Sequence, residues 1–259
     1  MSANATELFS EMHAKVDAWK APRTANDGPQ RNSTIEAYPG NTFVWRHTQH
    51  NVVASKSIDL KWAVANVLHF FAETEEASML PRYNKYAAKF LTDGRWLGAY
   101  GVGAMPGVRW CIEKLRNEPW TRRAVVTMNG YEHEDANRPT CWNLLHFLRN
   151  RDEQLEMLVY QRSLHLFNVM PYDTIVLSNV LNYVATAVSM PTGPLRWTVG
   201  SLHTAPTDSV DGVFRQRNTS IILPQELLTS PAQCLEMLMN PAATSEFGQW
   251  LLSDKEVRT

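Results

Sequence analysis

The hydrophobic pattern of the first part of the chain is helical. Apolar residues recur every three or four positions between residues 4 and 19, which predicts an amphipathic helix. Residues 21–33 are rich in Pro, Asn, Gly and Arg, so we expect a flexible loop after this helix. Residues 60–73 are apolar on most sides, which predicts a buried helix. The apolar side of the first helix consists of Leu8, Phe9, Met12, Val16 and Trp19.

After residue 122 the pattern becomes that of strands. Asn150-Arg151-Asp152 is a turn-forming group between two of these strands. A long apolar helix is expected over 174–190, between the third strand and the fourth. Strands before and after a central buried helix indicate an α+β domain. The four expected strands are residues 123–128, 141–149, 154–162 and 195–202.

The composition limits the classes of partner. The formal net charge is −1, so no global field would attract nucleic-acid polymer or an acidic membrane. An anionic ligand must therefore be bound by a local group of arginines. The longest apolar segment, 175–190, is interrupted by polar residues and is too short to span a bilayer. Residues 1–21 lack the continuous apolar stretch of a signal peptide.

Cysteine usage indicates a reducing compartment. The three cysteines, Cys111, Cys141 and Cys234, contain no CxxC pair and cannot all be joined in disulfides. We therefore expect free thiols and a cytoplasmic location. No internal repeat or long linker divides the chain, so residues 1–259 are expected to form one domain, with 1–33 leading into it.

Several residues with chemical potential have ordinary structural explanations when they are taken singly. A lone cysteine such as Cys141 is more often an inert core thiol than a nucleophile. Arg122-Arg123 is typical of solvated charge before a strand, and Arg162 of a surface salt bridge. Asp173 precedes an apolar helix, where capping is the usual role of an aspartate.

The order and spacing of these residues change that interpretation. Together they resemble the central signature of thymidylate synthases and of their relatives, the pyrimidine nucleotide hydroxymethylases. The segments 97–101 and 197–203 also resemble a Gly-x-x-Tyr-Gly loop and a Gly-x-x-His segment of that family. The motifs of the signature are Arg122-Arg123, Pro139-Thr140-Cys141, Gln161-Arg162-Ser163 and Met170-Pro171-Tyr172-Asp173.

The resemblance implies a fold and a partner copy. The implied fold is a single thymidylate-synthase-like α+β domain, in which a mixed sheet packs against a buried central helix. It also implies a homodimer formed sheet to sheet. The implied ligand is a pyrimidine nucleoside monophosphate, and the implied one-carbon donor is 5,10-methylenetetrahydrofolate.

The resemblance also implies roles for individual residues. Cys141 would add to C6 of the pyrimidine, and Tyr100 would line the reaction site; a thiolate needs nearby positive charge, which Arg162 can supply. Guanidinium groups suit a dianionic phosphate because each offers parallel N–H donors. Gln161 and His203 would help to hold base and sugar, with His203 at the ribose 3′-hydroxyl. The implied phosphate ligands are Arg31, Arg162, Ser163 and, across a dimer interface, Arg122 and Arg123.

Asp173 selects among the members of the family. Thymidylate synthases have Asn at this position, which contacts N3–H and O4 of uracil. Cytosine presents the opposite pattern, with an acceptor at N3 and an amino donor at N4. A carboxyl group can accept from N4 and share a proton with N3, but it meets O4 of uracil acceptor to acceptor unless it is protonated. The deoxycytidylate hydroxymethylases of the family have Asp here.

Four residues depart from the family pattern. Asn66 stands where a catalytic Glu is expected, and Asn cannot serve as a general base; Glu73, Glu75 and Glu76 are nearby alternatives in sequence. His165 replaces an Asp that contacts the pterin of folate, and Val169 replaces a Gly near the stacked folate ring. Ala205 replaces a tyrosine at the sugar, which raises the hypothesis of a ribonucleotide substrate. The sites of departure are Asn66, His165, Val169 and Ala205.

The sequence thus predicts a folate-dependent enzyme that hydroxymethylates C5 of CMP or dCMP through a Cys141–C6 adduct. C5 methylation of the same nucleotide or of dUMP stays open, as does a non-catalytic nucleotide-binding homologue. Whether water or hydride completes the reaction is not decided by the residues. The cluster Glu132-His133-Glu134-Asp135 has adjacent residues that rarely converge on one ion, so we expect no metal.

Overall fold

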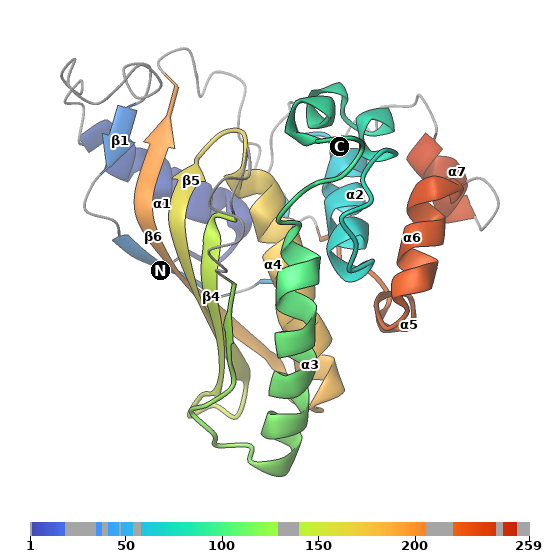
Figure 1. Ribbon diagram of the computed structural model, residues 1–259. Helices are drawn as coiled ribbons and strands as arrows, with labels where there is room; N and C mark the ends of the chain where they lie inside the picture. The colour runs from blue at the N-terminus through green and yellow to red at the C-terminus, as the bar shows by residue number, and fades with distance from the viewer. Residues whose placement is uncertain are drawn as a thin grey trace.

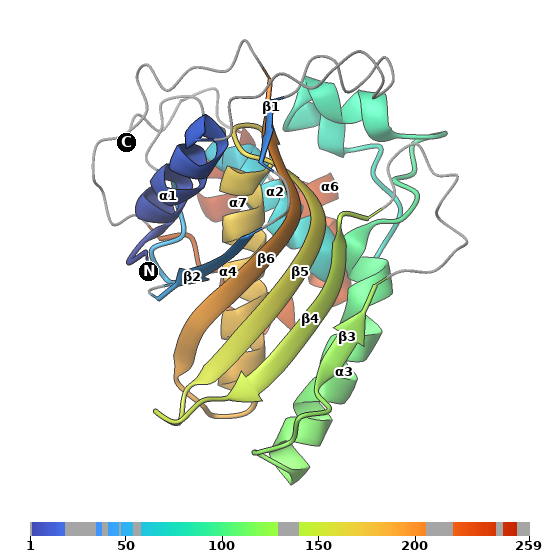
Figure 2. The ribbon, with the colours of Figure 1, turned by 90° about the vertical axis from the view of Figure 1, so that its left-hand side faces the viewer.

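The computed structural model describes residues 2–18, 35–37, 41–46, 48–53, 58–128, 140–205, 220–241 and 246–252. Its described strands form one six-stranded sheet, and the helices lie on one side of it (Figures 1 and 2). The predicted α+β fold, with a mixed sheet packed against a buried helix, is confirmed. The strands are β1 Ile35–Ala37, β2 Asn41–Trp45, β3 Val125–Thr127, β4 Trp142–Arg149, β5 Leu155–His165 and β6 Thr192–Thr204.

The strand order is β1-β6-β5-β4-β3, and β2 also pairs with β6. Among the pairs of named strands, only β5 and β6 run parallel, with Gln161 level with Val199 and His165 with His203; the isolated bridge between Ser2 and Trp45 is also parallel. The other pairs of named strands are antiparallel. The parallel pair needs a crossover connection, and the helix α4, Met170–Ala187, provides it. The sheet is therefore mixed, and its central strands lead directly into this helix.

The core lies between the sheet and the helices. Fourteen residues of α4 are buried, so it is the central buried helix that the apolar pattern predicts. Helix α2, Leu60–Phe71, packs against it, and its first turn is capped by Asp59, whose Oδ1 accepts from the backbone N–H groups of Lys61 and Trp62. The other helices are α1 Ala5–Ala18, η2 Leu80–Arg82, η3 Lys85–Phe90, α3 Tyr100–Asn117, α5 Gln225–Leu228, α6 Pro231–Met239 and α7 Glu246–Leu252.

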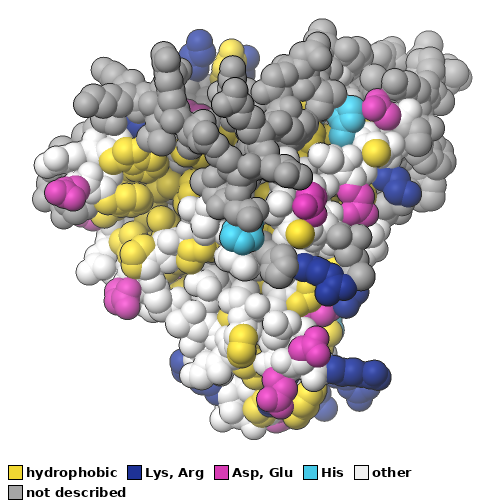
Figure 3. Space-filling model, turned by 180° about the vertical axis from the view of Figure 1, so that it is seen from behind, with side chains coloured by type: hydrophobic (Ala, Val, Ile, Leu, Met, Phe, Trp, Pro, Cys, Tyr) yellow, Lys and Arg dark blue, Asp and Glu magenta, His cyan; other side chains and the backbone are white. Residues whose placement is uncertain are grey.

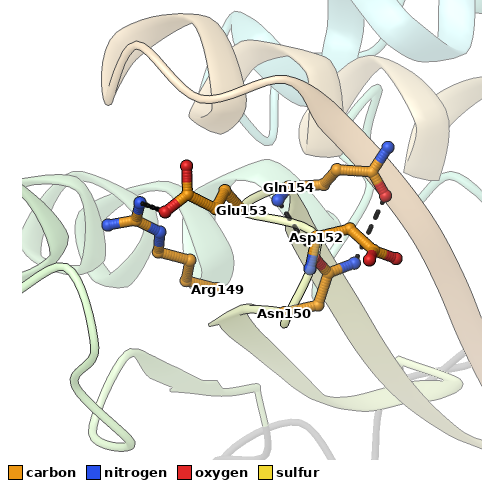
Figure 4. A network of polar contacts seen from close by, with 5 residues as sticks. All are labelled: Arg149, Asn150, Asp152, Glu153 and Gln154. Carbon is orange, nitrogen blue, oxygen red and sulfur yellow. Dashed lines mark hydrogen bonds and ion pairs between the residues drawn. The ribbon is translucent and has the colours of Figure 1, made fainter.

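The turn between β4 and β5 is fixed by side chains as well as by backbone. Asn150 Oδ1 accepts from the backbone N–H groups of Asp152 at 2.9 Å and Gln154 at 3.0 Å (Figure 4). Arg149 Nη2 pairs with Glu153 at 2.7 Å, and Glu153 has φ 62°. An asparagine side chain that accepts from backbone N–H groups a few residues later is typical of turns. The predicted turn at 150–152 is therefore confirmed, and the Asn150 side chain stabilises it.

The other face of the sheet carries no helix among the described residues (Figure 2). Tyr160 and Arg162 of β5 and Arg196 of β6 are exposed there. Seen from behind, hydrophobic side chains also gather at the surface on the side of the C-terminal helices (Figure 3). Within the described part of the chain, no helix has both the length and the apolar character needed to cross a membrane.

The first residues of α4 and α3 differ from the sequence predictions. The last long helix begins at Met170 rather than at Thr174, because Pro171 occupies its first turn, where a missing N–H costs nothing. Asp173 therefore lies inside the helix and does not cap it. Tyr100 does not lie in a loop but is the first residue of α3. Trp19 and the predicted loop over 21–33 lie outside the described residues.

Candidate active site

Cys141 lies directly before β4 and is half-buried, close to Tyr100. Its backbone N–H donates to the Tyr100 hydroxyl at 2.9 Å. Burial raises the pKa of Tyr100 well above its usual value, so the hydroxyl keeps its proton while it accepts this bond. The Tyr100 ring also packs against that of Trp142, with centroids 4.5 Å apart. Cys141 and Tyr100, two predicted site residues 41 positions apart, are thus brought together.

Arg162 lies beside Cys141 on the neighbouring strand. Its backbone N–H donates to the Cys141 carbonyl at 2.8 Å, and its Nε donates to the Thr140 carbonyl at 3.1 Å. The side chain is exposed. A guanidinium anchored one residue from a half-buried thiol provides positive charge at the place where a thiolate needs it.

Asp173 is buried at the beginning of α4, with 8% of its surface exposed. Its Oδ2 accepts from Trp142 Nε1 and from Gln161 Nε2, each at 3.0 Å. Burial raises the pKa of Asp173 to about 7, although these two hydrogen bonds act in the opposite direction. The carboxyl group can therefore change its protonation state near neutral pH.

Gln161 is completely buried and connects Asp173 to the sheet. Its Oε1 accepts from Trp197 Nε1 at 3.0 Å, and its Nε2 also donates to the Ser163 carbonyl at 3.0 Å. Trp142 and Trp197 were not among the residues singled out from the sequence. The available signal was the position of Trp142 next to Cys141, but the partners of both indoles are more than 30 residues away in the chain.

Asn66 interrupts an otherwise buried helix. It is the one residue between Trp62 and Phe71 that is not buried, and its Nδ2 donates to the Trp62 carbonyl at 2.7 Å. The nearby acidic residues are engaged in contacts of their own. Among the described contacts, Glu73 pairs with Arg109, Glu75 with Arg95, and Glu76 accepts from Ser78. These three glutamates line a cleft of about 380 Å³ with Thr74, Arg95 and Val102.

His203 and His165 lie side by side on β6 and β5. Their ring centroids are 5.2 Å apart in an edge-to-face arrangement. The backbone N–H of Asn168 donates to His165 Nδ1 at 3.3 Å. Ser163 is level with Ser201 in the same strand pair, so the predicted sugar and phosphate residues share one end of the sheet. Ala205 follows directly after β6.

Arg122 and Arg123 are exposed and lie just before the edge strand β3. β3 pairs with β4, and the two arginines lie near the end of β4 that is opposite to Cys141. Val125 is level with His146, and the Phe147 N–H donates to the Ala124 carbonyl. This register places Arg123 level with residue 148, roughly 20 Å along β4 from Cys141 at about 3.3 Å per residue. The two arginines are therefore not brought to the Cys141 of their own chain. Arg31, Pro139 and the cluster at 132–135 lie outside the described residues.

Comparison with known proteins identifies the family of the chain. A family model described as thymidylate synthase matches residues 21–213. The chain belongs to the thymidylate synthase family. This family consists of one-carbon transferases that use methylenetetrahydrofolate. The family assignment made from the ordered motifs is thus confirmed.

Individual relatives of this family are distant. Thymidylate synthase of Zymomonas mobilis is 25% identical over 149 residues, which cover 51% of this chain and 50% of that protein. Thymidylate synthase of Corynebacterium aurimucosum is 26% identical over 148 residues, 56% of this chain and 52% of that protein. The chain thus spans about half the length of these curated relatives. The crystal structure of thymidylate synthase from T4 phage shares the fold, with a TM-score of 0.65 and 18% identity over 88% of this chain and 91% of that one.

Proposed function

We propose that this chain is a one-carbon transferase that acts on C5 of a cytidine monophosphate, CMP or dCMP, with Cys141 as its nucleophile. The observation that supports cytosine is the buried Asp173, with a pKa of about 7, tied through Trp142 to the strand that begins beside Cys141. A carboxyl group that carries a proton at neutral pH is the complement of an unprotonated ring nitrogen.

The chemistry of the proposed residues is consistent with a covalent adduct. Cys141 Sγ forms a bond to C6 as the C5–C6 double bond opens, and the displaced electron pair moves through C4 to N3. Asp173 donates its proton to N3, which prevents negative charge from accumulating in a buried site. C5 is then an enamine carbon that can take a proton or another electrophile. Loss of the original C5 hydrogen, return of the N3 proton and departure of the thiolate restore the ring.

Tyr100 would hold the nucleophile in place. Its hydroxyl accepts from the backbone N–H of Cys141 and also hydrogen-bonds to the Cys141 side chain, so its retained proton would support the thiolate. Arg162 and Ser163 would bind the phosphate from the same subunit, and His203 the sugar hydroxyl. The substitution at Ala205 supports a ribonucleotide, which comparison of CMP with dCMP turnover tests; a strong preference for dCMP would contradict it.

The partner in the proposal is a second copy of this chain. Arg122 and Arg123 are too far from their own Cys141 to reach a phosphate bound there, and the sheet face beside them carries no described helix. A dimer formed through that face would bring the arginine pair of one subunit to the phosphate of the other. The predicted Arg31 contact stays a prediction.

The cofactor in the proposal is methylenetetrahydrofolate, which supplies a one-carbon unit. The residues at the expected pterin contacts fit it poorly. An imidazole nitrogen at His165 offers at most one acceptor where a carboxylate offers two oxygens, and Nδ1 already accepts from Asn168. Val169 adds bulk where the family pattern has glycine. The proposed roles of Cys141 and Asp173 therefore do not depend on the folate, and both hydroxymethylation and methylation are compatible with them.

Release of tritium from [5-³H]CMP and [5-³H]dCMP tests the proposal, with [5-³H]dUMP for comparison and with and without methylenetetrahydrofolate. The exchange requires the C6 adduct but no one-carbon donor. We expect release from a cytidine nucleotide, and its loss in Cys141→Ser. An Asp173→Asn variant should shift the preference towards dUMP. If the wild-type protein releases no tritium from any of the three nucleotides, the enzyme proposal fails and the chain is a nucleotide-binding homologue.

A further inference from the structure

The orientation of the Gln161 amide is determined by its neighbours. Trp197 Nε1 can only donate, so the Gln161 atom 3.0 Å from it must be the amide oxygen. The amide nitrogen then points to Asp173 and to the Ser163 carbonyl, both of which accept. Trp197 is completely buried, so water cannot replace the bond when the amide turns. Gln161 is therefore a fixed donor to Asp173.

Trp142 makes the second fixed contact to the same atom. Its indole N–H donates to Asp173 Oδ2 at 3.0 Å, as the Gln161 amide does. A carboxyl oxygen has two lone pairs, and both of those on Oδ2 are occupied. None of the described residues donates a hydrogen bond to Oδ1. A proton on Asp173 must therefore reside on Oδ1, and Oδ1 is the atom left for a ligand.

We propose that Trp142, together with Gln161, is a positioning residue that restricts Asp173 to one ligand-facing oxygen, the proton-bearing Oδ1, so that the site selects a pyrimidine with an unprotonated N3. This inference rests on the proposed function. Cytosine N3 accepts the Oδ1–H bond. Uracil has N3–H at that position, so two donors would face each other unless Asp173 gave up its proton in a buried environment.

The single-oxygen arrangement has a pH signature that two-oxygen recognition lacks. If both oxygens faced the base, the neutral acid would match cytosine and uracil equally, and the ionised acid would oppose one acceptor of either base, N3 of cytosine or O4 of uracil, so discrimination would change little with pH. With Oδ1 alone, discrimination is greatest while the acid is neutral and declines above the pKa of Asp173, about 7, where Oδ1 can accept from uracil N3–H. The titratable groups that interact with it are Tyr100 and, through Tyr100, Cys141. No Lys or Arg of the described residues contributes to its pKa.

The matched variants are Trp142→Phe and Trp45→Phe. Both remove a buried indole, but Trp45 Nε1 has no hydrogen-bond partner among the described residues, so its loss changes packing without removing a donor. Trp197→Phe is a second test variant, because it releases the Gln161 amide. The ligand-free readout is the titration of the Asp173 carboxyl by carbon NMR. We expect Trp142→Phe to raise its midpoint by about one pH unit, because a donor that favours the ionised form is lost, and Trp45→Phe to leave it unchanged.

The second readout is the ratio of CMP to UMP affinity between pH 6 and 8.5. The ratio should fall with pH in the wild type, and at pH 6 it should drop about tenfold in Trp142→Phe and in Trp197→Phe but not in Trp45→Phe. An unchanged carboxyl midpoint in Trp142→Phe, or a wild-type ratio that stays constant or rises with pH, would overturn the inference. If instead Trp142→Phe raises the carboxyl midpoint but neither nucleotide binds to the wild type, the proposed function has failed. The positioning of Asp173 by Trp142 is then still supported.

Discussion

A Cβ atom on Gly101 would lie 1.8 Å from the carbonyl oxygen of Phe70. This contact joins the first turn of α3 to the last turn of α2, and Gly101 directly follows Tyr100. The hydroxyl of Tyr100 in turn holds the backbone of Cys141. The close approach of two helix backbones therefore sets the position of the residue that fixes the proposed nucleophile.

Gly101→Ala is expected to separate the two helices and to displace Tyr100. The backbone carbonyl cannot move aside alone, so we expect a loss of at least about 3 kcal/mol in the free energy of unfolding. Urea unfolding measures it, and tritium release follows the site. Gly103→Ala is the control, because its Cβ would meet nothing within 4 Å and alanine favours a helix by about 0.5–1 kcal/mol. Equal stabilities of the two variants would contradict the argument.

Alkylation should distinguish Cys141 from the other cysteines. Cys111 and Cys234 are fully buried, and burial raises their pKa to about 11 and about 12. Since only the thiolate reacts, we expect iodoacetamide at pH 7.5 to modify Cys141 more than about a hundredfold faster. Mass spectrometry of tryptic peptides identifies the site, and Cys141→Ser should remove the fast phase. Rapid labelling of Cys111 or Cys234 in the native protein would show that the prediction is wrong.

Local sequence accounts for β4, β5 and their turn, where strand alternation and Asn150 act within a few residues. It fails for α3, which contains Gly101, Gly103, Pro106 and Gly107 and looks like a poor helix. Packing explains the difference, because a Cβ on Gly107 would lie 2.9 Å from Val126 of β3. The glycines that weaken the helix locally are what allow it to approach the sheet, and that depends on contacts between distant segments.

In the candidate site, too, some residues could be predicted from local sequence and others depend on contacts between distant segments. Cys141, Arg162 and Asp173 were identified from ordered motifs, which carry chemical identity. Trp142 and Trp197 were missed, because an indole in a strand looks like core until its N–H partner is known. The partners, Asp173 and Gln161, are 31 and 36 residues away along the chain. Hydrogen bonding in the folded state therefore adds what the motifs lack, namely which oxygen of Asp173 is occupied.

Asp173 should make the protein less stable as pH rises. Its pKa is about 7 in the folded state and about 3.9 in an unfolded chain, so the folded state binds more protons between these values. The contribution of Asp173 to the free energy of unfolding is therefore complete below about pH 4. It is lost as the pH rises to about 7, which lowers the free energy of unfolding by on the order of 3–4 kcal/mol. Asp173→Asn should abolish this decline in urea unfolding at pH 5 and 8. Asp152→Asn, at an exposed turn position, is the control and should retain it.

Subunit complementation tests the role assigned to the arginine pair. Cys141→Ser subunits keep their arginines, and Arg122→Ala/Arg123→Ala subunits keep their nucleophile, so each homodimer should be inactive. In a mixed dimer, the intact Cys141 site receives the arginines of the other subunit. Random exchange should then restore about a quarter of the wild-type tritium release, because half of the dimers are mixed and each has one complete site. The Cys141→Ser protein mixed with a Cys141→Ser/Arg122→Ala/Arg123→Ala protein is the control. Full activity of the arginine variant alone, or no recovery after subunit exchange is verified by mass spectrometry, would show that the pair does not serve a neighbouring site.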